Sequence, residues 1–198
     1  MSAAALDALA ERRRIIGMLP NDDVLALWLD PAEVGPLDGG TLRHLLDAGI
    51  DPADIASPWL ICRARVIFGG NGRYRPDRIG EPALIIGVLD NGLVDIAAWH
   101  PSTGRIATRL GVGAVLGLSA VDDGCGSASR PLPVWRDPVG WLLAHRCGIV
   151  IVDWGRTAHL LAGAVLQPED KAHGAELTRR LRVLPPVIVA PRQIGAPA

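Results

Sequence analysis

The N-terminal part of the chain repeats its apolar residues with helical spacing. The pattern predicts helices at residues 3–19, at about 22–29 and at 41–48. Gly49 is placed to end the third helix in the left-handed conformation. Asp51 and Pro52 predict a further helical turn, because aspartate caps helices and proline fits the first helical position. We therefore expect residues 1–57 to form a helical region packed on the core.

From Trp59 onward apolar residues recur at every second position instead of with helical spacing. Apolar residues at positions 60, 62, 64, 66 and 68 alternate with Arg63 and Arg65, which predicts a half-buried strand. Strands are also predicted at 83–89, 93–99 and 105–110. Asn91-Gly92, between two of them, is a strong hairpin signal. The middle third is thus predicted to be an antiparallel β-meander of about four strands.

The last third alternates strands with helices. A glycine- and serine-rich loop is expected at about 119–131, within the small-residue segment 111–130. Strands are predicted at 133–135, 148–152 and 186–190, with helices from Pro138, capped by Asp137, and at 168–182. This is a C-terminal β-α-β-α-β segment. The whole pattern predicts an α+β fold in which a core domain, residues 58–198, follows the helical region.

Composition limits the class of protein. The chain has 198 residues, of which 49% are hydrophobic and 21% charged, so it is able to bury one core. Its longest charge-free apolar run, 110–121, is about a dozen residues, short of the roughly 20 that cross a bilayer. Charged residues occupy the place where a signal peptide needs an apolar core. We expect a soluble, cytoplasmic protein with no membrane partner.

Three cysteines are widely spaced, without a CxxC pair or histidines at metal-finger spacing. We expect no disulfide, no metal site and no cofactor. Cys62 and Cys147 lie in or beside apolar runs and are expected to be buried, whereas Cys125 lies in the glycine-serine loop and is expected to be exposed. Six tryptophans are expected to supply core volume, because small aliphatic residues dominate the rest of the core.

The charge is unevenly distributed. Residues 1–57 hold ten acids and four arginines, for a net charge of −6, while residues 58–198 hold eleven acids and sixteen bases, for +5. Opposite charge favours docking of the two parts. We therefore expect acidic residues of the helical region to approach arginines of the core. The candidates are Asp22, Asp23, Asp47 and Asp54.

Strand ends are the first places to look for chemistry, because side chains there face the crevice of an α/β unit. Asp153, Arg136 and Arg192 fit this position. Asp153 is a weak candidate for a catalytic or metal-binding carboxylate, and the competing interpretation, that it caps the next helix, is favoured. Arg136 is a second weak catalytic candidate. His100 is the third, as a general base beside Asp95.

Other catalytic signatures are weaker still. Glu169, His173 and Glu176 share one helix face, a pattern that a metal site and a solvated helix surface both produce, and the solvated surface is favoured. The sequence has no GxSxG elbow and no phosphate loop. Whether the protein is an enzyme stays open.

The segment 63–78 is strongly basic. Five arginines against the single acid Asp77 give it a net charge of +4, and Tyr74 lies among them. Arginines on a strand face can follow phosphates, and an aromatic ring can stack on a base. The candidate nucleic-acid-binding residues are Arg63, Arg65, Arg73, Tyr74, Arg75 and Arg78. There are two competing interpretations. The acidic helical region covers this surface, or the charges prevent an edge strand from pairing with another chain.

Three functions follow from these patterns. The preferred one is an accessory or interaction protein. The first alternative is a nucleic-acid-associated protein that uses the arginines of 63–78, and the second is an enzyme with a strand-end acidic site at Asp153.

Overall fold

The computed structural model of the chain describes residues 34–56, 61–90, 92–122 and 124–182. Several predictions concern residues outside these ranges: the helices at 3–19 and 22–29, the strand at 186–190, and the residues Asp22, Asp23 and Arg192.

Two short helices precede the first sheet, α3 (Gly39–Asp47) and α4 (Pro52–Ala56). Asp38 caps α3, since its carboxylate accepts the Thr41 N–H at 2.8 Å. That hydrogen bond also lowers the pKa of Asp38. Gly49, with φ of 90°, ends this turn as predicted, and Asp51 accepts the Ala53 N–H at the start of α4.

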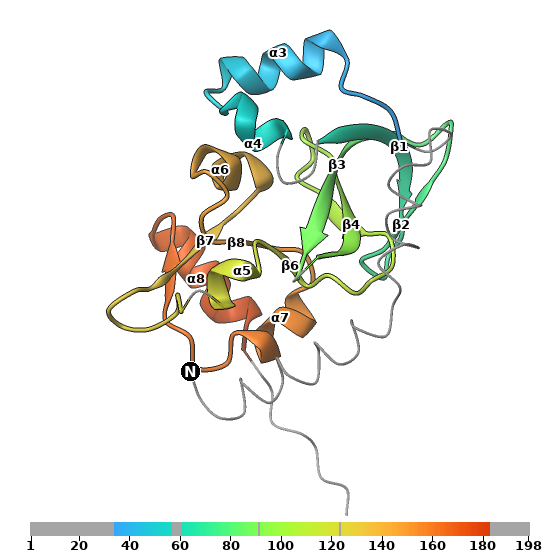
Figure 1. Cartoon of the computed structure of the whole chain (residues 1–198). Helices are drawn as coiled ribbons and strands as arrows, with labels where there is room; N and C mark the ends of the chain where they lie inside the picture. Colours follow the sequence, from blue (N-terminus) through green and yellow to red (C-terminus); the bar gives the residue numbers. More distant parts are fainter. Residues whose placement is uncertain (1–33, 57–60, 91, 123, 183–198) are drawn as a thin grey trace, which may run out of the picture.

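The first sheet is antiparallel and curled (Figure 1). Its strands are β1 (Cys62–Phe68), β2 (Tyr74–Pro76), β3 (Glu81–Leu89), β4 (Leu93–Trp99) and β5 (Ile106–Thr108), in the order β2-β1-β3-β4-β5. β3 and β4 pair antiparallel, as predicted for the two strands that flank Asn91-Gly92. β2 was not predicted, because a strand of three residues is too short to show an alternation of apolar and polar positions. The Thr108 N–H donates to the Gly72 carbonyl at 3.0 Å, which brings the two ends of the sheet together.

The second sheet contains β6 (Val115–Leu116), β7 (Leu132–Trp135), β8 (Ile149–Ile151) and β9 (Leu166–Pro168), in the order β6-β8-β7-β9. β6 is antiparallel to β8, whereas β7 is parallel to β8 and to β9. The helices that accompany it are α5 (Ser119–Asp122), α6 (Pro138–Leu143), α7 (Trp154–Leu160) and α8 (Lys171–Arg180). Strands β7 and β8 and helices α6 and α8 lie where the C-terminal segment was predicted to have them, whereas α7 and β9 were not predicted and the last predicted strand lies outside the described residues. The fold is α+β as expected.

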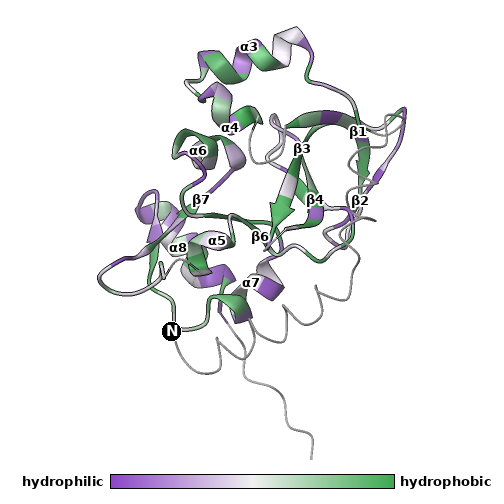
Figure 2. Cartoon of the chain, viewed as in Figure 1, coloured by the Kyte–Doolittle hydropathy of each residue, from purple (hydrophilic) through white to green (hydrophobic). Residues whose placement is uncertain are grey.

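Apolar side chains form three clusters. One fills the inside of the curled sheet, around Val66, Ile85 and Ile96. A second lies between the two sheets and beneath α3, α4 and α6, around Ile86 and Leu142. The third lies between the second sheet and helices α5, α7 and α8. Because β3 contributes alternate residues to the first two clusters, both of its faces are apolar, and it is green along most of its length in Figure 2.

In the segment after β5, one element was not predicted and two predictions are wrong. The small residues near 111–121 contain the unpredicted buried strand β6, because glycine and alanine allow close packing of the two sheets. The loop expected at about 119–131 begins with helix α5. Cys125, expected to be exposed, is buried in the third cluster, where its N–H donates to the Ala120 carbonyl.

Cys147 is exposed rather than buried. It follows His145 and Arg146, which both have positive φ angles, of 52° and 59°. This left-handed turn between α6 and β8 carries the cysteine away from the core. Cys62 is buried as expected, and burial raises the pKa of its thiol.

Within the part of the chain that the structure covers, none of the helices has the length and apolar character that crossing a membrane requires.

Candidate functional site

A groove of about 540 Å³ lies where α3 meets the curled sheet. Its walls come from β1, from β3, from the N-terminal end of α3 and from the turn that follows β4. Arg63, Arg65 and His100 line it together, so three residues that the sequence offered for two different functions meet at one site. We call it the arginine groove.

The two arginines of the groove are held by main-chain carbonyls. The Arg63 Nε donates to the Pro36 carbonyl at 3.0 Å, and the Arg65 Nη1 donates to the Gly80 carbonyl at 2.9 Å. Arg63 also lies 3.6 Å from the Asp38 carboxylate. Arg65 forms no ion pair with any described residue. The groove therefore presents two positioned guanidinium groups, and one of them has no neutralising carboxylate among the residues that the structure describes.

The floor of the groove is apolar. Arg63 is the cross-strand partner of Leu84, which places the arginine beside a buried leucine on the outer face of the sheet. Pro82 adds further apolar surface, while the hydroxyl-bearing Thr41 and Ser102 line the rim. Ala64 and Ala83 line the groove as well, although their side chains pack into the cluster inside the curled sheet.

His100 lines the groove without the partner predicted for it. Its Nε2 lies 3.9 Å from a Glu81 oxygen, and its Nδ1 is buried without a hydrogen-bond partner among the described residues. Asp95 instead is fully buried and accepts four main-chain N–H groups, those of Ile96, Leu110, Val112 and Gly113. The structure thus does not pair His100 with Asp95 as a general base and its carboxylate.

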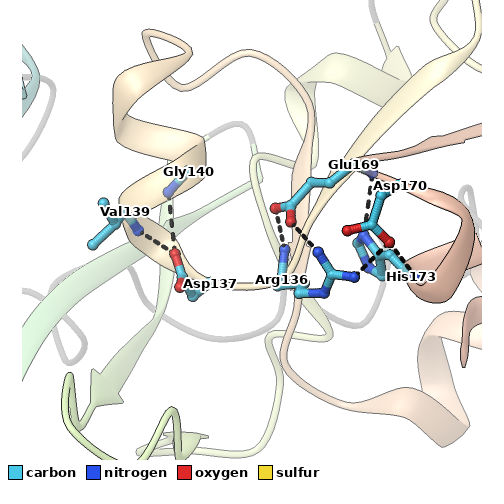
Figure 3. A network of polar contacts seen from close by, with 7 residues as sticks. All are labelled: Arg136, Asp137, Val139, Gly140, Glu169, Asp170 and His173. Carbon is cyan, nitrogen blue, oxygen red and sulfur yellow. Dashed lines mark hydrogen bonds and ion pairs between the residues drawn. The ribbon is translucent and has the colours of Figure 1, made fainter.

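One of the predicted strand-end residues, Arg136, forms an ion-pair network with two carboxylates (Figure 3). Arg136, directly after β7, donates to Glu169 at 2.7 Å and to Asp170 at 2.8 Å, at the start of α8. These contacts raise the pKa of Arg136 and lower that of the Asp170 carboxyl. Arg136 is therefore paired with both carboxylates of the network.

Two of the aspartates act as helix caps. Asp170 accepts the His173 N–H at 2.8 Å, and Asp153 accepts the Arg156 N–H at 3.1 Å, so both act as N-caps.

His173, expected on a solvated surface, is buried, and its Nδ1 accepts the Glu169 N–H. Burial lowers its pKa. Among the described residues, no group of three or more histidine, cysteine, aspartate or glutamate side chains is arranged so that it could hold a metal ion.

The rest of the basic segment is dispersed. Tyr74 is buried, with 6% of its surface exposed, opposite Phe68 inside the curled sheet, so its ring is not available for stacking on a base. Arg75 pairs with Asp77 at 3.2 Å. Arg78 is exposed in the turn between β2 and β3, and Arg73 lies against Gly111.

The expected contact between the acidic region and the core is present at one end of α4. The Asp54 carbonyl accepts hydrogen bonds from Arg146, and its carboxylate lies 2.7 Å from the His145 Nδ1. Burial lowers the pKa of Arg146. The prediction for Asp54 is confirmed: the arginine reaches the main chain of Asp54 and the histidine reaches its side chain.

Sequence reasoning missed the groove and the role of Asp95. A lone acid within the apolar run 93–99 is the signal for a buried carboxylate with main-chain partners. Nothing in the sequence indicates that His100 shares a groove with Arg63 and Arg65, because that arrangement depends on the pairing of β3 with both β1 and β4.

Comparison of the chain with protein-family models, with curated proteins and with solved structures finds no match.

Proposed function

We propose that this protein is an accessory or interaction protein without catalytic activity, and that the arginine groove binds an acidic peptide segment of a partner protein. The observation that carries the proposal is the pair Arg63 and Arg65, fixed above an apolar floor, with Arg65 free of any carboxylate in the described part of the chain.

The chemistry of the groove suits a peptide with acidic and apolar side chains. A guanidinium group offers a planar fork of donors that matches a carboxylate in a bidentate arrangement. Main-chain carbonyls already hold each fork in place, so less side-chain entropy is lost on binding. The surface around Pro82 and Leu84, the cross-strand partners of Arg65 and Arg63, accepts an apolar side chain between the two charges.

A binding function is favoured over a catalytic one because the catalytic candidates have structural roles. Asp153 caps α7, and Arg136 joins β7 to α8 through Glu169 and Asp170. His100 has no carboxylate within hydrogen-bond distance among the described residues.

A peptide is favoured over nucleic acid because the groove lacks a stacking surface. Tyr74 points into the core of the curled sheet, and the other described residues that line the groove carry no aromatic ring except the imidazole of His100. An apolar floor also contributes little to binding of a phosphate backbone.

Peptide selection tests the proposal. A random twelve-residue library displayed on phage is selected on the full-length protein. The expected peptides carry at least two carboxylates flanking an apolar residue. Their binding should weaken about tenfold or more in Arg65→Gln, because charged hydrogen bonds are lost. Arg179→Gln, an exposed arginine of α8, is the matched control and should bind normally.

Three outcomes contradict the proposal: enrichment of basic or uncharged peptides, equal binding by Arg65→Gln, and no enrichment at all. Single-stranded oligo(dT) is measured in parallel. Tight oligo(dT) binding that depends on Arg63 and Arg65 would instead support the nucleic-acid-associated alternative.

A further inference from the structure

Two arginines from different parts of the fold converge on Gly111. The guanidinium of Arg73, which precedes β2, lies so close that a Cβ at Gly111 would come within 2.4 Å of its Nε. Arg156, in the first turn of α7, donates from its Nη1 to the Gly111 carbonyl. The curled sheet and the second layer thus each contribute one cation to the same residue.

Neither guanidinium is neutralised within the described part of the chain. The ion pairs there include neither Arg73 nor Arg156, and both residues are exposed. Like charges held close together repel each other, at a cost that salt and water reduce but do not abolish. An anion bound between them would remove that repulsion.

The turn between the two arginines is rigidly held. The buried Asp95 carboxylate accepts the N–H groups of Leu110, Val112 and Gly113, on both sides of Gly111. Gly111 itself has a φ of 74°, which favours glycine, and its missing side chain leaves the space that Arg73 occupies. The turn is therefore a preorganised platform for the two side chains.

We propose that Arg73 and Arg156 form a binding site for a single phosphoryl group. Two guanidinium groups offer more N–H donors than one carboxylate can accept, whereas a phosphate presents at least three acceptor oxygens and up to two negative charges. This site is separate from the arginine groove, and it does not depend on the function proposed for the groove.

Nuclear magnetic resonance of the arginine Nε–Hε groups tests the site. Inorganic phosphate, added at constant ionic strength against chloride, should shift the Arg73 and Arg156 signals saturably. Arg73→Gln should weaken binding about tenfold. Arg156→Lys, which keeps the charge but not the fork, should weaken it less than Arg156→Gln. Arg179→Gln should bind as the unchanged protein does, and amide signals far from Gly111 report whether each variant is folded.

The source of the phosphoryl group is distinguished by two further titrations, with ribose 5-phosphate and with oligo(dT). Binding of the monoester at least as tight as that of inorganic phosphate supports the proposal. Two results overturn it: non-saturable shifts, or equal phosphate affinity in Arg73→Gln. Oligo(dT) binding far tighter than that of the monoester, with the same arginine dependence, would also overturn it and indicate a polynucleotide surface.

Discussion

The Asp95 carboxylate accepts the main-chain N–H of Gly113 at 2.9 Å, and through this bond β4 holds the segment that leads into β6. β4 belongs to the curled sheet and β6 to the second sheet. A fully buried anion is tolerated here because four N–H groups surround it. The carboxylate therefore fixes the connection between the two layers.

Asp95→Asn is expected to destabilise the protein by about 3 kcal/mol, since the new amide group would direct donors at N–H groups that are themselves donors. Chemical denaturation measures the change in the free energy of unfolding. Asp47→Asn, at an exposed position of α3, is the control and should change it by less than about 0.5 kcal/mol. A loss at Asp95 no larger than that at Asp47 would show that the carboxylate is not essential to the connection.

Gly117→Ala should be strongly destabilising. Gly117 has a φ of 76°, and a Cβ there would lie 2.2 Å from the Gly148 carbonyl oxygen, which is main chain and has little freedom to move. Gly104→Ala is a matched control, because Gly104 has a φ of 68° and open space around it. We expect about 1–2 kcal/mol of loss at Gly104 from the backbone conformation alone, and a clearly larger loss at Gly117. Equal losses would argue against close packing at this turn.

Mild acid should destabilise the protein through His173. Burial lowers the pKa of His173 in the folded state, so the unfolded chain, with a histidine pKa of about 6.5, takes up the proton first. The free energy of unfolding should therefore fall as the pH drops from 7 to 5. In His173→Gln this decrease should be smaller. An identical pH dependence in the two proteins would contradict the burial of a neutral imidazole.

The thiols should differ in reactivity. Cys147 is exposed, whereas Cys62 and Cys125 are buried, and burial raises the pKa of Cys62. In the native protein, Ellman's reagent should modify one thiol rapidly and the other two only after unfolding. Cys147→Ser should abolish the rapid phase. Rapid modification of two or three thiols would mean that the segment around Cys125 opens readily.

Local signals in the sequence predict the helix ends and the long strands. Asp137 and Gly49 perform the roles that their chemistry implies, and alternating residues place Arg63 and Arg65 on the outer face of β1. These predictions succeed because a cap or an alternation depends on residues within one turn or one strand.

Features that depend on distant partners were not predicted. β2 and β9 have three residues each and form only because β1 and β7 pair with them. The burial of Cys125 and the exposure of Cys147 depend on the turns that the chain makes before and after each cysteine. The pattern of apolar residues around the cysteines does not predict these turns. The arginine groove likewise requires the register of β1 against β3.

The affinity of an acidic peptide for the protein, with and without Arg65, tests the central claim most directly. A fluorescein-labelled peptide from the selection is titrated with the full-length protein, with Arg65→Gln and with the control Arg179→Gln, at low and at high salt. We expect a dissociation constant about tenfold or more higher for Arg65→Gln, unchanged for Arg179→Gln, and higher in salt for the unchanged protein. Equal dissociation constants for the unchanged protein and Arg65→Gln would contradict the assignment of the groove as the binding site.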